Sequence, residues 1–376
     1  MIQNSKFKIQ NFQGSKIEIK SRRRLTKRNL PILYTPGVAE LSREIAKNKK
    51  KVFELTWKKN SVAIVSDGSA ILGLGNLGPE AALPVMEGKS VLFKELANVD
   101  AVPIILATQD TEKIIETVKN IAPGFGGINL EDISAPRCFE IEKRLVNELD
   151  IPVFHDDQHG TAIAVLAGLV NALKVVKKNI RNVRIVISGA GAAGTAVTKL
   201  LSKYGARKIV VFDSKGSLCC NCLRKTNGPK KEIACVTGNE KFFTSVGEAL
   251  EGADVFIGVS TGRLLTAGDI RRMNKGAIVF AMSNPVPEIS YKEGKKGGAA
   301  VMATGRSDFP NQINNALVFP GLFRGALDAR TNIISEKIKI GIALAIASLV
   351  KNPKSDKIVP DVLDRRVARV VAKVFK

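Results

Sequence analysis

The feature of this chain that most constrains its fold is a glycine-rich hexapeptide in its second half. It follows directly on Arg184–Ser188, a run of Val and Ile residues typical of a buried strand, and it precedes a segment with helical spacing. A further β-branched run, Lys208–Asp213, comes next. A strand, a helix and a second strand within about 30 residues predict a right-handed βαβ unit of a parallel sheet. The hexapeptide reads Gly189-Ala190-Gly191-Ala192-Ala193-Gly194.

The three glycines of this hexapeptide have separate roles in a Rossmann-type dinucleotide site. Gly189 permits the tight turn after the strand, Gly191 lets the backbone approach a pyrophosphate because it has no Cβ atom, and Gly194 lets the helix pack close to the strand. Free N–H groups at the N-terminus of the helix then face the phosphates. A glycine-rich turn that binds nothing is the alternative, and the strand and helix on either side argue against it.

Asp213 ends the second strand of the unit, about 20 residues after the hexapeptide. An acidic residue at this place accepts hydrogen bonds from the adenosine ribose. Its carboxylate would repel a 2′-phosphate, so the sequence favours NAD over NADP. Arg207 and Lys215 could offset that repulsion, and NADP therefore stays the alternative cofactor.

The apolar runs along the chain predict two α/β domains, because 376 residues are too many for one ordinary domain. We expect residues 1–158 to form an N-terminal α/β domain that binds substrate and metal. Residues 159–376 then form a doubly wound parallel sheet of Rossmann type. The predicted strands outside the βαβ unit are 16–20, 61–65, 101–106, 128–130, 254–259 and 277–281; the predicted helices are 111–120, 138–149, 159–176 and 333–350, the last packing back on the body.

Two pairs of acidic residues follow apolar runs of the first domain. Glu131-Asp132 comes directly after one run and Asp156-Asp157 after another. The carboxyl ends of strands in an open α/β sheet border a cleft, which suits acidic residues better than a core does. Carboxylate oxygens are the ligands that Mg²⁺ and Mn²⁺ prefer, so these pairs are candidate metal ligands.

The chain is strongly basic, with a formal net charge of +23. Such a charge attracts nucleic acid, anionic membranes or carboxylate substrates. The basic residues are spread along the chain, with short runs at 22–24, 49–51 and 230–231, and no aromatic residues interleave with them as a stacking platform for single strands. We favour a solvated basic surface and keep a polyanion contact as the alternative.

Nothing in the sequence predicts a secreted or membrane protein. The basic N-terminal region has no apolar signal core, and the apolar stretch at 338–350 is too short to span a bilayer. Five cysteines do not suit a disulfide scaffold of this length, so we expect a cytoplasmic protein.

Cysteine and histidine spacing gives only weak support for zinc. Four cysteines lie close together in sequence, but they do not form a repeated C-x-x-C pattern, and we interpret them as reduced thiols in an irregular loop. His155 and His159 bracket the second acidic pair, and we interpret both as supporting residues. The four cysteines are Cys219, Cys220, Cys222 and Cys235.

Taken in order, several segments resemble the malic enzyme family in its short bacterial and archaeal form. The Tyr-Thr-Pro-Gly segment and the two acidic segments are specific, and the resemblance covers roughly residues 16 to 350. The matching segments are 34–39, 66–78, 87–89, 129–133, 154–161, 189–194, 283–285 and 304–325.

This resemblance implies a reaction and a role for individual residues. The reaction is the oxidative decarboxylation of malate to pyruvate and carbon dioxide with a nicotinamide cofactor and Mg²⁺ or Mn²⁺, in a homodimer. The implied metal ligands are Glu131, Asp132 and Asp157. Lys89 is implied as the general base supported by Asp156, Tyr34 as the general acid, and Asn284 and Asn315 as amides that contact substrate, with Asn284 also beside the cofactor.

The chemistry of malate explains these residue types. Oxidation removes the C2 hydroxyl proton while hydride leaves for the nicotinamide, and a lysine can accept that proton only if its pKa falls through burial or nearby positive charge. Metal chelation of the C1 carboxylate and the C2 oxygen would stabilise the enolate that decarboxylation leaves. Tyr34 would then protonate that enolate to give pyruvate.

One departure and two alternatives remain. Larger members of the family carry a substrate-binding arginine where this chain has Ala70. A malolactic enzyme, which releases lactate instead of pyruvate, shares the same site. A basic polyanion-binding protein that keeps the dehydrogenase fold is the alternative from another class, although it would have no need for Tyr34 and Lys89.

Overall fold

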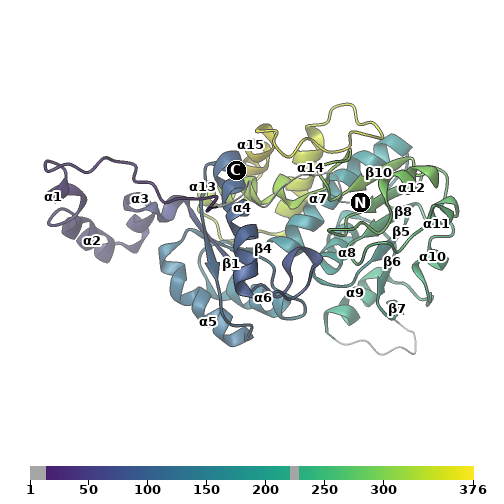
Figure 1. Ribbon diagram of the computed structural model, residues 1–376, viewed down its shortest axis with the longest axis horizontal. Helices are drawn as coiled ribbons and strands as arrows, with labels where there is room; N and C mark the ends of the chain where they lie inside the picture. The colour runs from purple at the N-terminus through teal and green to yellow at the C-terminus, as the bar shows by residue number, and fades with distance from the viewer. Residues whose placement is uncertain (1–13, 221–227) are drawn as a thin grey trace.

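The computed structural model describes residues 14–220 and 228–376, and it contains two parallel sheets side by side (Figure 1). The first sheet has the order β2-β1-β3-β4, and all of its pairings are parallel. β1, β3 and β4 are short and buried because helices cover both faces, whereas β2 at the edge is partly exposed. They are β1 (Ser61–Ser66), β2 (Asp100–Ile105), β3 (Gly127–Leu130) and β4 (Val153–His155).

The second sheet has the order β10-β9-β8-β5-β6-β7 and is parallel except for β7. Since β5 pairs with both β6 and β8, the winding reverses at β5, and the crevice at its carboxyl end is the place where such folds bind ligands. The predicted doubly wound sheet is therefore confirmed. Its strands are β5 (Arg184–Ser188), β6 (Lys208–Asp213), β7 (Gly216–Ser217), β8 (Val255–Gly258), β9 (Ile278–Ala281) and β10 (Val301–Thr304).

Helix α7 (Asp156–Val176) runs between the two sheets and is almost entirely buried. Its many alanines and glycines allow close packing of α8 (Ala192–Tyr204) and α14 (Glu336–Ser348). The predicted start at residue 159 is wrong, because the helix begins directly after β4 and its first turn contains both aspartates of the second acidic pair. Among the described residues it is also the one helix long and apolar enough to cross a membrane, and 72% of that stretch is buried inside the protein.

The remaining helices cover the sheets and return the chain to the first domain. Helix α13 packs against both α4 and α15, and Phe93 of α4 meets the rings of Phe319 and Phe323. We keep the division at residue 158 as a proposal, since the C-terminal helices contact α4 of the first domain as well as α7 and α8. These helices are α4 (Pro79–Ala97), α5 (Thr111–Ile121), α6 (Arg137–Glu148), α9 (Pro229–Thr237), α10 (Val246–Ala249), α11 (Ala267–Arg271), α12 (Tyr291–Lys296), α13 (Phe319–Ala329) and α15 (Arg366–Lys373).

The N-terminal part of the chain forms an arm that projects from the two sheets, at the left of Figure 1. It contains α1 (Leu30–Leu33), α2 (Val38–Lys47) and α3 (Val52–Leu55), none of which has a buried residue. Apolar side chains of the arm face solvent, Ile32 at 69% exposure among them. We refer to residues 28–55 as the N-terminal arm.

The strand predicted at 16–20 is wrong. Its alternating pattern suggested a half-buried strand, but Ile19 is fully exposed and the segment is irregular. The segment is held on α4 instead, where Lys16 Nζ donates to the Pro84 carbonyl and Ser15 Oγ lies 3.2 Å from Glu87 Oε1. A strand needs a neighbouring edge to satisfy its backbone, and this segment finds none.

Candidate active site

The carboxyl ends of β3 and β4 bring four acidic side chains together. Glu131 and Asp132 follow β3, while Asp156 and Asp157 open α7 directly after β4. Carboxylate oxygens of Glu131, Asp132 and Asp157 lie within 4.8 Å of one another. The Asp132 backbone N–H donates to Asp157 Oδ2 at 2.8 Å, which ties the two strand ends together.

The chemistry of this cluster fits a divalent cation. Burial and the charge of Asp157 raise the pKa of Asp132 to about 8 and raise the pKa of Glu131 as well. Asp132 Oδ2 is buried and has no hydrogen-bond partner among the described residues. Three confined carboxylates with an unsatisfied oxygen form the donor set that Mg²⁺ or Mn²⁺ takes.

Lys89 of α4 reaches into this cluster and is only 6% exposed. Its Nζ forms a short ion pair with Asp156 Oδ2, lies 3.1 Å from Glu131 Oε1, and stands 3.8 Å from the centre of the Phe319 ring. The sequence indicated Asp156 alone as a neighbour of Lys89. The structure shows that Glu131 and Phe319 also contact this lysine. Lys89, Glu131 and Asp156 thus form one buried charged group.

The carboxylates around Lys89 oppose the expected fall in its pKa. Burial lowers the pKa of Lys89, but the charges of Asp156 and Glu131 outweigh burial and raise it above its usual value. Burial likewise raises the pKa of Asp156 to about 6, with the lysine opposing. The two carboxylates next to Lys89 therefore favour its protonated form.

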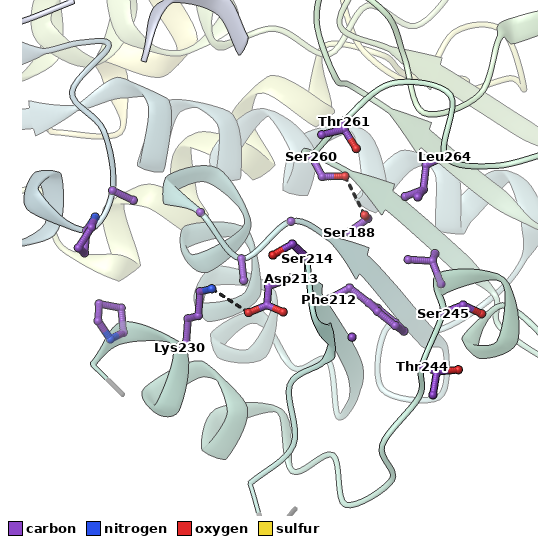
Figure 2. Close-up of a pocket in the computed structure, with 18 of the residues that line it drawn as sticks. Ser188, Phe212, Asp213, Ser214, Lys230, Thr244, Ser245, Ser260, Thr261 and Leu264 are labelled. Atoms are coloured by element: carbon purple, nitrogen blue, oxygen red, sulfur yellow. Dashed lines mark hydrogen bonds and ion pairs between the residues drawn. The ribbon is translucent and has the colours of Figure 1, made fainter. Parts of the chain in front are cut away.

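A cavity of about 780 Å³ lies at the carboxyl end of β5 (Figure 2). Gly189, Ala190 and Gly191 line it, and a Cβ atom on Gly191 would meet no other atom within 4 Å, so that glycine leaves room for a phosphate. Gly189 has a φ of +113°, and a Cβ atom on Gly194 would come within 1.8 Å of the Gly189 carbonyl oxygen. The tight turn at Gly189 and the close packing at Gly194 are thus present, while the phosphate contact of Gly191 stays a prediction. Ala192 and Ala193 lie in the first turn of α8 behind this loop.

Asp213 lines the same cavity, as predicted, but its carboxylate is already paired. Lys230 of α9 places Nζ 2.7 Å from Asp213 Oδ2 (Figure 2), and the Lys215 backbone N–H donates to Oδ1. The sequence indicated Arg207 and Lys215 as possible counter-charges but not Lys230, which lies in the first turn of α9. A paired carboxylate repels a 2′-phosphate less than a free one.

The two domains meet at the edge of this cavity. Ala135, Pro136 and Phe139 of the first domain line it, and they follow Asp132 closely in sequence. The nucleotide cavity therefore borders the segment that carries the acidic cluster.

The two asparagines expected at the substrate lie on the second domain. A Cβ atom on Gly160 would come within 1.9 Å of Asp156 Oδ1 and 3.1 Å of the Asn315 Cβ atom, so Asn315 stands beside the acidic cluster. Asn284 is exposed after β9, and its carbonyl oxygen lies against Gly73 of the glycine-rich loop after β1. Both asparagines are thus at the junction between the domains.

Tyr34 is not brought to this site by its own chain. It follows α1 in the N-terminal arm, and its side chain is 68% exposed. Helix α2, next to it, packs mainly on the neighbouring short helices of the arm.

The cysteine segment is described only in part, and Cys222 lies outside the described residues. Cys219 is disulfide-bonded, so the expectation of reduced thiols is wrong for this residue. Cys220 Sγ contacts Cys235 Sγ at 2.7 Å, and both are exposed. Among the described residues the acidic cluster is the one group with metal-ligand geometry.

A Rossmann-type nucleotide cavity that adjoins a buried lysine and a carboxylate cluster defines an NAD(P)-dependent oxidoreductase of two α/β domains. The chain belongs to the malic enzyme family. The family model for the malic enzyme N-terminal domain matches residues 14–146, and the model for the malic enzyme NAD binding domain matches residues 158–376.

Individual relatives agree with this assignment. The chain is 52% identical over 361 residues to the bifunctional malic/malolactic enzyme of Bacillus subtilis, covering 96% of this chain and 87% of the relative. It is 53% identical over 361 residues to the NAD-dependent malic enzyme of Geobacillus stearothermophilus, covering 95% of this chain and 75% of that enzyme. The crystal structure of the NAD-dependent malic enzyme of Thermotoga maritima superposes with a TM-score of 0.93 at 45% identity, covering 98% of each chain.

Proposed function

We propose that the protein oxidises malate to pyruvate and carbon dioxide, reducing a nicotinamide cofactor and requiring a divalent cation. The observation that carries the proposal is the burial of Lys89 between Asp156 and Glu131, next to three carboxylates that fit a metal. A dehydrogenase that only binds nucleotide needs no such group. Purified protein with malate, nicotinamide cofactor and Mn²⁺ should form reduced cofactor and pyruvate in equal amounts, and omission of the metal should stop both.

Lys89 and Asp156 perform the proton transfers of the oxidation in this proposal. The Lys89 amine accepts the proton of the C2 hydroxyl, and Asp156, fully buried beside it, holds the ammonium that forms. The ring of Phe319 covers the lysine and helps to keep water from it. Asn315, beside Asp156, is placed to hold a substrate carboxylate by its amide.

Glu131, Asp132 and Asp157 would hold the metal ion. When bound, the cation supplies positive charge that lowers the pKa of Lys89, binds oxygens of malate and stabilises the enolate charge. Asn129 donates to Glu131 Oε2 at 3.1 Å, which orients that carboxylate for its ligand role.

Metal binding should stabilise the protein more strongly as pH rises. The pKa of Asp132 is raised to about 8 in the folded, metal-free protein, so its proton stabilises the fold at low pH and this contribution is lost as pH rises through about 8. A cation must displace the proton of Asp132 in order to bind. It therefore stabilises the protein most at a pH at which Asp132 has already lost that proton. We expect the increase in Tm on adding Mn²⁺ to be small near about pH 5 and several degrees near about pH 8.5. An equal increase at both pH values, or a larger one at low pH, would contradict the proposed metal site. Asp132→Asn removes one of the three ligands and should make the increase small at both pH values.

We propose NAD as the main cofactor, with NADP also accepted because Lys230 neutralises Asp213. Lys230→Met should lower kcat/KM for NADP about tenfold or more and change kcat/KM for NAD much less, since only NADP carries the extra phosphate. Lys231→Met is the matched control, because Lys231 lies on the same helix and makes no described bond to Asp213. If the ratio of the two specificity constants stays the same in Lys230→Met, Lys230 has no part in cofactor choice.

We propose a homodimer in which Tyr34 of one subunit completes the site of the other. Two observations support this: the side chain of Tyr34 is exposed, and the N-terminal arm presents unpaired apolar side chains such as Ile32 and Leu41. A symmetric dimer can bury such surfaces in pairs. Tyr34, reaching the acidic cluster of the partner subunit, would protonate the enolate.

The malolactic reaction is the second candidate, because one relative is named a bifunctional malic/malolactic enzyme. The two outcomes differ in product, so pyruvate with net reduced cofactor supports our proposal, and lactate without it supports the alternative. The cytoplasmic location and the absence of a membrane or nucleic-acid contact stay predictions.

A further inference from the structure

Glu142 is a buried acidic residue for which the proposed mechanism has no use. It lies on α6 and is 9% exposed. Its Oε1 accepts from the His155 backbone N–H at 2.8 Å, and its Oε2 lies 3.0 Å from Gln158 Nε2 and 2.9 Å from His159 Nε2. All three partners belong to the junction of β4 and α7, which also carries Asp156 and Asp157.

Besides the bond from the Asp132 N–H to Asp157 and the ion pair of Asp156 with Lys89, the start of α7 has no side-chain cap of its own. His155, the N-cap residue of α7, makes no side-chain capping bond, and both of its ring nitrogens are buried without a hydrogen-bond partner among the described residues. Glu142 therefore supplies from another helix the acceptor that the chain does not provide locally. A negative charge near the N-terminus of a helix is also favourable to the helix dipole.

The charge of Glu142 is itself secured by its partners. Burial would raise the pKa of Glu142, but contact with His159 and the bond from the His155 backbone outweigh it and lower the pKa to about 2. These contacts therefore favour the ionised carboxylate, in which both oxygens can accept hydrogen bonds.

A second contact continues from His159 to the C-terminal part of the chain. Lys339 Nζ lies 3.1 Å from His159 Nδ1 and 2.8 Å from Glu336 Oε1, both lysine and glutamate being on α14. An ammonium group can only donate, so Nδ1 accepts and Nε2–H is left to donate to Glu142. The chain of contacts therefore runs from α14 through α7 to α6.

We propose that Glu142 is a positioning residue, which holds the β4–α7 junction so that Asp157 faces the metal and Asp156 faces Lys89, with Lys339 fixing the tautomer of His159. The inference rests on the proposed function and extends it to residues outside the reacting site. Glu142 contacts neither the proposed metal ligands nor Lys89 in the described structure, so it acts through the backbone and side chains of residues 155–159.

The substitutions that test this should be tolerated by the fold. Glu142, His159 and Lys339 line a pocket of about 670 Å³ and are not enclosed in a closely packed core. Glu142→Gln keeps the size of the side chain and removes the charge, so only one of its two oxygens is left to accept. Asp254→Asn is the matched control, because Asp254 is also a buried carboxylate that accepts a backbone N–H, from Arg184 at 2.8 Å, at the far end of the second sheet.

The measurement is the dissociation constant for Mn²⁺ of the full-length enzyme, taken by calorimetry or electron spin resonance without malate. We expect Glu142→Gln to raise it about tenfold and to lower kcat, while the dissociation constant for NAD stays within about twofold. His159→Gln, which interrupts the series of contacts between α14 and α6, should raise the dissociation constant for Mn²⁺ several-fold. Asp254→Asn should leave it unchanged, even if Tm falls.

The outcomes separate this inference from the proposed function. If wild type binds Mn²⁺ and folded Glu142→Gln and His159→Gln bind it equally well, Glu142 has no positioning role and the inference is wrong. Should Glu142→Gln fail to fold, His159→Gln alone decides. A wild-type protein that binds no Mn²⁺ would overturn both the proposed metal site and the inference.

Discussion

Lys89→Met is expected to lower kcat for malate oxidation about a thousandfold. Loss of a positioned general base typically costs two to four orders of magnitude, and no other lysine lies in the described acidic cluster to replace it. The methionine keeps the packing against Phe319, while Asp156 and Glu131 lose their cation. Nucleotide affinity should change little, because the nucleotide cavity is lined by other residues.

A stability control is needed for this variant, because removal of one partner of a buried ion pair costs about 3–5 kcal/mol. Lys58→Met is the matched control. Lys58 is also a buried lysine, at 8% exposure, but its Nζ donates to the carbonyls of Ala122 and Pro123, on a side of the first sheet that carries no acidic cluster. It should lose stability and keep kcat. A Lys89→Met enzyme that is folded and retains more than about a tenth of wild-type kcat would show that Lys89 is not the base.

Tyr34→Phe is expected to lower kcat about a hundredfold or more, and a mixed dimer with Lys89→Met is expected to regain activity. If Tyr34 acts across the interface, the two substitutions of a heterodimer affect the same site. In a heterodimer one site then carries both changes and the other carries neither. Random exchange between equal amounts of the two variants should restore about a quarter of wild-type activity.

A mixed dimer that regains no activity would contradict this arrangement. If Tyr34 serves the site of its own chain, each site of the mixed dimer keeps one substitution and no activity returns. Each variant incubated alone is the control for exchange itself, and size measurement confirms that dimers persist. A monomer with full activity would overturn both the dimer and the placement of Tyr34.

Local sequence patterns predicted the strands well, because buried β-branched runs depend on few distant contacts. β1, β2, β3, β5, β6, β8 and β9 agree with prediction to within one residue at each end, whereas β4, β7 and β10 were not predicted as strands. The segment at 16–20 failed because alternation alone does not provide a neighbouring strand. The start of α7 was placed too late, because Glu142 supports that helix from α6 and a local pattern contains no sign of it.

The sequence predicted which residues form the site more completely than it predicted the contacts between them. Glu131, Asp132, Asp156 and Asp157 were expected together because parallel strands end at one edge, and the structure has them there. Lys230 was missed, since its contact with Asp213 joins residues 17 positions apart in different elements. Tyr34 was expected at the site, but its side chain is exposed on the N-terminal arm. Contacts made through distant helices or a second subunit leave no periodic signal in one sequence.

The most direct test of the central claim follows the absorbance of reduced nicotinamide while wild-type enzyme turns over L-malate, with pyruvate and lactate measured in the same samples. The account predicts reduced cofactor and pyruvate in equal amounts, dependent on Mn²⁺ or Mg²⁺ and abolished by chelation, with no lactate. Lactate without reduced cofactor, or no turnover of malate with metal and both cofactors present, would contradict it.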